Sequence, residues 1–381
     1  MEHRRRTVLA SVGIVLIFFL IQVGTLALVE PFQQEGHQVV EDTSDPTISI
    51  VYLAAIVVVT GLMLLAFKYG GESILRLVII FAGSYIGFYV FDVLAPEAAS
   101  VTVADVPVNV LAWGGAVAIG LALYLYPEWY VIDATGIVMG IGAAGLFGIN
   151  FGILPALVLL SALAVYDAIS VYGTEHMLTL ASGAMDMKVP VVLVMPVSRS
   201  YSFIEDGGPE HVQSDEAADD EPADDSSATE PSSLGVTDIE ALGTDGIAEL
   251  DDDEVEQIEL SVMDELDEKL TTALRERLPD RDALFIGLGD AVIPTVLVAS
   301  AAFFIDTGPE VSLGVASASL PAVTAMGGIL TGLVVLLWLV LKGRAHAGLP
   351  LLNGGAIAGY LIGALLSGLS IVEALGLDSF L

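Results

Sequence analysis

Ser161-Ala-Leu-Ala-Val-Tyr-Asp-Ala-Ile-Ser170 lies inside an apolar run, residues 151–172, in which Asp167 is the only charged residue. A helix needs about 20 apolar residues to cross a bilayer, because each residue adds about 1.5 Å along the axis. Eight other runs meet or approach this length: 7–29, 48–67, 76–94, 108–126, 130–149, 284–305, 318–341 and 349–367. The sequence therefore predicts an all-α polytopic membrane protein with nine transmembrane helices.

The composition agrees with a membrane protein that carries one strongly acidic aqueous loop. Of the 381 residues 55% are hydrophobic and the mean hydropathy is +0.76, yet the formal net charge is -35. Residues 200–268 hold 25 of the 48 acids and no Lys or Arg. Such acidity keeps proteins hydrated in a high-salt cytoplasm and predicts a halophilic archaeal source, with an acidic binding tail as the alternative. The absence of cysteine excludes disulfides, thiol nucleophiles and Cys-ligated metal sites.

The basic residues predict the orientation, because cytoplasmic loops of membrane proteins are enriched in Lys and Arg. With the N-terminus inside, nine spans place all 13 basic residues on the cytoplasmic side, whereas outer loops such as 30–47 hold acids only. We therefore expect a multi-pass protein of the cell membrane. Its N-terminus and its 173–283 loop are predicted to be cytoplasmic, and its C-terminus to be outside.

The predicted spans divide the chain into three parts. In chain order they are a six-helix membrane block, a cytoplasmic loop and a three-helix membrane block, at residues 1–177, 178–282 and 283–381. Within the loop, residues 205–250 are too polar to bury an apolar core and are predicted to be disordered. The β-branched run Lys188–Val197 indicates a short strand or an interfacial segment, and apolar residues at helical spacing over 255–278 predict an amphipathic helix.

A second intramembrane carboxyl, Asp290, lies in the apolar stretch Phe285-Ile-Gly-Leu-Gly-Asp-Ala-Val-Ile293. An ionised carboxylate within a bilayer is costly and needs a partner or a function, and apart from Arg76, the first residue of the run 76–94, no Lys or Arg lies in any predicted span. Asp167 and Asp290 are each predicted to lie roughly 8–10 Å below the cytoplasmic surface at the helical rise, so they can face one another. Two adjacent carboxyls would hold one shared proton. Aspartyl proteolysis requires such a pair, one member to activate water and the other to polarise the peptide carbonyl.

Other chemistry at this depth is weighed against proteolysis. Neutral, hydrogen-bonded acids and a proton or cation relay of a transporter both stay open. A zinc protease is excluded by the lack of a His-Glu-x-x-His motif, and a serine protease by the lack of any histidine within a span. The prepilin peptidase type also uses Gly-x-Gly-Asp, but its motif usually continues with Lys where this chain has Val292.

The residues around the aspartates resemble a known family. Tyr166-Asp167 in one span, Gly287-Leu-Gly-Asp290 in the next and a count of nine spans are similar to the presenilin and signal peptide peptidase family. Tyr166-Asp-Ala-Ile-Ser-Val-Tyr-Gly-Thr-Glu-His-Met177 closely resembles the same stretch of archaeal presenilin homologues. The family's third motif, Pro-Ala-Leu at the start of span nine, falls at Ala347-Gly-Leu349 before Pro350, where only Leu349 is kept.

The resemblance implies an intramembrane aspartic endopeptidase that cuts transmembrane segments, with Asp167 and Asp290 as its catalytic pair and without a metal or cofactor. It implies that residues of the three motifs bind substrate or shape the site: Tyr166, Gly287, Leu288, Gly289, Ala347, Gly348, Leu349 and Pro350. The expected partners are transmembrane-helix substrates and the lipid bilayer, without nucleic acid, and a homo-oligomer stays open. The alternatives are a secondary transporter or relay built on the same carboxyls, and a catalytically inactive family member.

The orientation yields a first testable prediction. Reporter fusions at residues 40, 100 and 220 should report outside, outside and inside, because the predicted inner loops carry all 13 basic residues. A reporter at 220 found outside would contradict the predicted orientation.

Overall fold

The computed structural model describes residues 2–40, 42–95, 100–103, 106–173, 189–197, 201–204, 270, 283–341 and 347–377. Apart from Leu270, these residues belong to one compact unit made of Met1–Gly208 and Ala283–Leu381. The predicted disordered stretch 205–250, and all but Leu270 of the predicted helix 255–278, lie outside the described residues.

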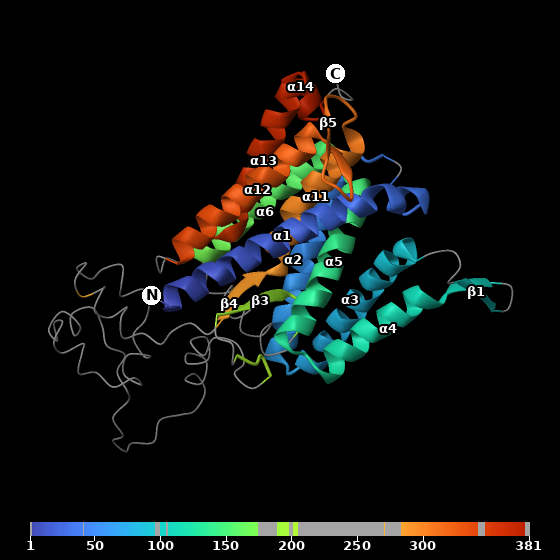
Figure 1. Ribbon diagram of the computed structural model, residues 1–381, viewed down its shortest axis with the longest axis vertical. Helices are drawn as coiled ribbons and strands as arrows, with labels where there is room; N and C mark the ends of the chain where they lie inside the picture. The colour runs from blue at the N-terminus through green and yellow to red at the C-terminus, as the bar shows by residue number, and fades with distance from the viewer. Residues whose placement is uncertain are drawn as a thin grey trace, which may run out of the picture. The chain divides into compact units, whose positions relative to one another are not determined.

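Helices make up most of the described chain (Figure 1). In chain order they are α1 (Glu2–Gln34), α2 (Thr47–Lys68), α3 (Glu72–Leu94), α4 (Val110–Leu125), α5 (Trp129–Asn150), α6 (Ile153–Gly173), α11 (Leu288–Phe304), α12 (Leu320–Val340), α13 (Gly348–Leu366) and α14 (Ile371–Ala374). Within the described ranges seven of them are long and apolar enough to cross a membrane, whereas the apolar helices α4 and α11 have only 16 and 17 residues. The helical architecture agrees with the prediction, and the count of nine spans stays a prediction.

Three short antiparallel sheets of two strands each interrupt the helices. They pair β1 (Ser100–Val103) with β2 (Val106–Asn109), β3 (Val192–Pro196) with β4 (Ala283–Gly287), and β5 (Glu310–Ser312) with β6 (Ser317–Ser319). β3 lies within the predicted strand segment, but β4 corrects the prediction of one continuous helix over 284–305. A short apolar run is compatible with either a strand or a helix, and only the pairing with β3 selects the strand.

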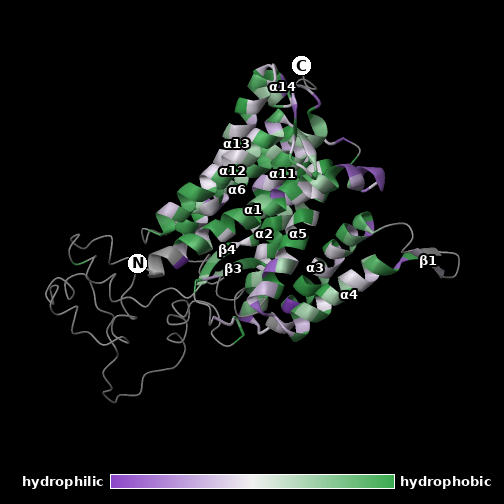
Figure 2. Ribbon diagram, in the orientation of Figure 1, coloured by the Kyte–Doolittle hydropathy of each residue, from purple (hydrophilic) through white to green (hydrophobic). Residues whose placement is uncertain are grey.

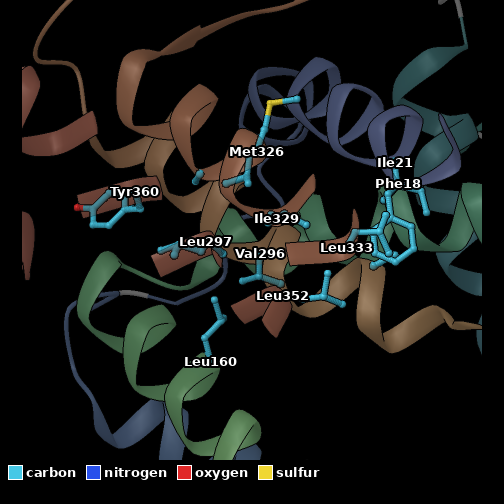
Figure 3. Packing of buried hydrophobic residues seen from close by; sticks show 14 of the residues in the cluster. Phe18, Ile21, Leu160, Val296, Leu297, Met326, Ile329, Leu333, Leu352 and Tyr360 are labelled. Carbon is cyan, nitrogen blue, oxygen red and sulfur yellow. The ribbon is translucent and has the colours of Figure 1, made fainter. Parts of the chain in front are cut away.

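The helix α11 lies inside the bundle, where it contacts α1, α5, α6, α12 and α13. Its residues Thr295–Ala301 are all buried. Figure 3 shows its Val296 and Leu297 packed among labelled side chains of the surrounding helices: Phe18, Ile21, Leu160, Met326, Ile329, Leu333, Leu352 and Tyr360. A helix that is apolar all round is typical of such an enclosed position. The helix that carries Asp290 is therefore held by protein on several sides.

The helices are mostly apolar, as their green colouring in Figure 2 shows, and α2 exposes its apolar residues. Ser49 is the only buried residue of the described helix α2, and Val57, Val58 and Leu62 are each about 60% exposed. Large apolar areas of this kind are unfavourable in water but suit contact with lipid chains. Ser49 Oγ donates a hydrogen bond to the Pro155 carbonyl at 2.6 Å, which ties α2 to α6.

The helices α12 and α13 pack closely enough for their backbones to touch. A Cβ atom on Gly328 would overlap the Gly355 carbonyl, and a Cβ on Gly359 would overlap the Thr324 carbonyl. Small residues allow this approach, which membrane helices use because lipid provides no hydrophobic driving force for their association. The contact fixes α13, which begins beside the two aspartates.

This close contact predicts that Gly328→Ala destabilises the protein by about 1–3 kcal/mol, because the added methyl has no space. The neighbouring Gly327 has no atom within 4 Å of its hypothetical Cβ, so Gly327→Ala is the matched control. It should be neutral or slightly stabilising, since Ala is the better helix former. Thermal unfolding in detergent, followed by circular dichroism, compares the two, and equal midpoints would contradict the packing argument.

Candidate active site

Two carboxyl groups from different helices meet inside the bundle. Asp167 lies in the last two turns of α6 and is only 6% exposed, and Asp290 lies in the first turn of α11 and is partly buried. The helices α6 and α11 contact one another, and the two carboxyls are close enough for an electrostatic interaction. The structure thus brings together the two acids that the sequence places 123 positions apart, as 290 minus 167 gives.

The change from strand to helix positions Asp290. The strand β4 ends at Gly287, and α11 begins at Leu288, so Asp290 is the third residue of the helix. The helix that carries Asp290 thus begins four residues later than the start of the predicted span 284–305. The first N–H groups of a helix have no intrahelical acceptor, and a negative charge is favourable there. A Cβ on Gly287 would lie 3.4 Å from Asp290 Oδ2, so this glycine borders the carboxyl directly.

The start of α13 lies against both acids. The Leu349 N–H donates a hydrogen bond to Asp167 Oδ2 at 3.0 Å. A Cβ on Gly348 would lie 3.2 Å from Asp290 Oδ2 and 3.3 Å from its Cγ and Oδ1. The segment Ala347-Gly-Leu349 therefore contacts Asp167 through the main-chain N–H of Leu349. It comes close to Asp290 because Gly348 has no side chain. These contacts explain how it can differ from Pro-Ala-Leu and still border both carboxyls.

A buried side-chain amide joins α13 to α6 one helical turn after Leu349. Asn353 is fully buried in α13, and its Nδ2 donates to the Leu160 carbonyl of α6 at 2.9 Å. Its Oδ1 has no hydrogen-bond partner among the described residues. Asn353 was missed by the sequence reasoning, although an amide in an otherwise apolar span is a signal that could have identified it.

Three other predicted site residues differ in their exposure. Tyr166 is 43% exposed on α6, so its side chain faces outward, and its predicted role at the site stays a prediction. Leu288 is buried against Gly136 and Gly140 of α5. Gly289 is exposed, and its hypothetical Cβ would meet only Ile293.

Asp133 of α5 and Glu128, the N-cap residue before α5, hold the segment that carries β3. Asp133 accepts a hydrogen bond from the Val194 N–H at 2.7 Å. Glu128 accepts hydrogen bonds from Ser202 Oγ at 2.6 Å and from the Phe203 N–H at 3.2 Å. No local pattern in the sequence shows such pairings, because they join positions more than 60 residues apart.

The chain is similar to known intramembrane proteases over most of its length. The family described as signal-peptide peptidase, presenilin aspartyl protease matches residues 15–369. A solved presenilin family intramembrane aspartate protease, in the C222 space group, is 29% identical; the alignment covers 93% of this chain and 99% of that one, with a TM-score of 0.55. A second such structure, in the P2 space group, is 28% identical, with coverages of 93% and 97% and a TM-score of 0.52. No curated protein matches. The predicted resemblance and the presenilin-like helical fold are confirmed.

The contact at Gly348 leads to a prediction for a detergent assay with a single-span test substrate. Gly348→Val should lower the cleavage rate by about 100-fold, because its branched side chain would displace the Asp290 carboxyl. Gly348→Ala, which restores the family's residue, should keep most of the activity after a shift of a few tenths of an ångström. The matched control is Gly354→Val, since Gly354 has open space around its Cβ position. Equal rates for the two valine variants would contradict the contact.

Proposed function

The chain belongs to the signal-peptide peptidase and presenilin aspartyl protease family and is an intramembrane aspartic endopeptidase, and we propose that Asp167 and Asp290 form its catalytic pair. One observation carries this proposal: carboxyls from α6 and α11 lie against the adjacent residues Gly348 and Leu349 inside the bundle, and no Lys or Arg lies in either helix. The start of α13 completes the site by giving the Leu349 N–H to Asp167.

In this proposal the two carboxyls titrate as one unit that holds a single proton in its active form. The ionised member takes a proton from a water molecule as the water attacks the scissile carbonyl carbon. The protonated member donates a hydrogen bond to the carbonyl oxygen, where negative charge develops. Proton transfer to the leaving nitrogen then breaks the C–N bond and returns the pair to its starting state.

Substrates in this proposal are transmembrane helices of membrane proteins, and they have to be locally extended before cleavage. The pairing of β3 with β4 indicates where such a segment can bind. The Leu288 N–H donates to the Val191 carbonyl at 2.8 Å. In an antiparallel pair the bonded residues alternate, so the main-chain groups of Leu193 and Met195 also point towards β4. By the same alternation, the N–H and C=O of Phe285 point away from β3. An extended substrate can therefore pair with β4, directly before Gly287 and Asp290.

The orientation that we propose follows the basic residues. The N-terminus and the 173–283 loop are cytoplasmic and the C-terminus is outside, so the aspartates lie towards the cytoplasmic face. The partners are single-span substrates and the bilayer itself, and a homo-oligomer stays open.

The proposal predicts that Asp167→Asn and Asp290→Asn each lower the cleavage rate by roughly 10²–10⁴-fold, because neither carboxyl can do the work of the other. Asp306→Asn, which changes an exposed acid just after α11, should retain the rate of the parent protein. The pH–rate profile of the parent should be bell-shaped, and a transition-state mimic with a hydroxyl in place of the attacking water should inhibit. A test substrate followed by mass spectrometry gives all three results.

The same variants separate a protease from a transporter. A relay built on these carboxyls predicts proton or cation flux in liposomes that both asparagine variants abolish. Flux without cleavage by the parent protein under any condition would overturn the proposed function.

A further inference from the structure

The acid Asp133 is buried beside the strand next to the site. It lies in the second turn of α5, is 6% exposed, and accepts the Val194 N–H at 2.7 Å. This length lies within the ordinary range of an N–H···O hydrogen bond. Val194 is the central residue of β3, which makes the bond a contact to the middle of the strand rather than to its end.

The direction of the Val194 N–H identifies the edge of the strand that Asp133 occupies. In the β3–β4 ladder Val194 lies opposite Phe285, and Val191, three residues earlier, bonds to Leu288 across the pair. Antiparallel residues alternate between bonding to the partner strand and pointing away from it. The Val194 N–H therefore points away from β4, and the Asp133 carboxyl accepts its hydrogen bond at the outer edge of β3.

One face of α5 also holds the first turn of α11. Residues 133, 136 and 140 recur at helical spacing and so share a face. A Cβ on Gly136 would lie 3.2 Å from Leu193 Cδ2 of β3 and 3.8 Å from Leu288 Cδ1. A Cβ on Gly140 would lie 3.4 Å from Leu288 Cδ1. This face of α5 therefore fixes the position of β3 relative to the first turn of α11, which carries Asp290.

We propose that Asp133 is a positioning residue that sets the register of cleavage. It anchors β3 to α5 and closes the β3 edge to other strands, so an extended substrate can pair only with β4, whose end leads into the site. The inference rests on the proposed function, because it assigns the way in which the same site aligns its substrate. Without this bond β3 could shift along α5 and move β4 with it. A substrate paired with β4 would then present its peptide bonds to the carboxyls in more than one register.

The central test compares Asp133→Asn with Asp133→Leu. Asparagine keeps an oxygen acceptor for the Val194 N–H, whereas leucine has a similar size and no acceptor. Asp133→Leu should lower kcat/KM by about tenfold and spread cleavage over additional neighbouring bonds of a single-span substrate, as measured by mass spectrometry of the products. Asp133→Asn should retain the product pattern of the parent protein. A purely structural role predicts a loss of activity in proportion to the folded fraction with an unchanged pattern, and that result would overturn the proposal.

A readout without proteolysis separates this proposal from the proposed function. Amide hydrogen exchange of the segment 189–197 should be faster in Asp133→Leu than in the parent and unchanged in Asp133→Asn. Unchanged exchange in the leucine variant would overturn the anchor, whatever the activity. If Asp133→Leu exchanges faster but the parent protein cleaves no substrate, the anchor holds and the proposed function is wrong.

A second variant keeps the test decisive if Asp133→Leu does not fold. Gly136→Val leaves Asp133 in place and adds a branched side chain where even a single methyl would lie 3.2 Å from Leu193 Cδ2, so it should push β3 away from α5. It should spread the products in the same way, whereas Gly114→Val, at an open position of α4, should not. An unchanged product pattern in Gly136→Val would count against the proposal.

Discussion

A polar group inside a bilayer has to find its partner within the protein, because the lipid offers none, and this constraint accounts for the arrangement around the two aspartates. Asp167, within α6, accepts the Leu349 N–H from the first turn of α13, and Asp290 lies in the first turn of α11. The starts of two helices therefore lie at the two carboxyls, whereas Asp167 itself belongs to a continuous helix.

The strand β4, directly before α11, requires its own support. Extended backbone at membrane depth is tolerated only where protein or a water-filled cavity satisfies it. The strand β4 is paired with β3 on one side, and β3 is in turn held by Asp133 of α5. The chain of support thus runs from α5 through β3 to β4 and then to the turn with Asp290. The other edge of β4 is the part of this arrangement that a substrate backbone can complete.

Much of this fold could be predicted from the sequence, because length, apolarity and the sparse charges of membrane helices are local properties. Asp167 and Asp290 were identifiable as charges in apolar runs, and their flanking residues carried the family resemblance. The strand β4 was predicted as helix, since a short apolar run does not distinguish the two. Asp133 and Asn353 were missed because their partners, Val194 and Leu160, are brought to them only by the tertiary fold.

The segment Ala347-Gly-Leu349 shows why a motif can change its letters and keep its contacts. Its hydrogen bond to Asp167 comes from a main-chain N–H, which any residue except proline supplies at that position. Its approach to Asp290 depends on how little side chain residue 348 carries, and glycine meets that requirement at least as well as alanine. The requirement at this place is thus a small residue followed by a free N–H at the start of a helix. Pro-Ala-Leu and Ala-Gly-Leu both have these two features, so the departure in sequence is compatible with the contacts seen here.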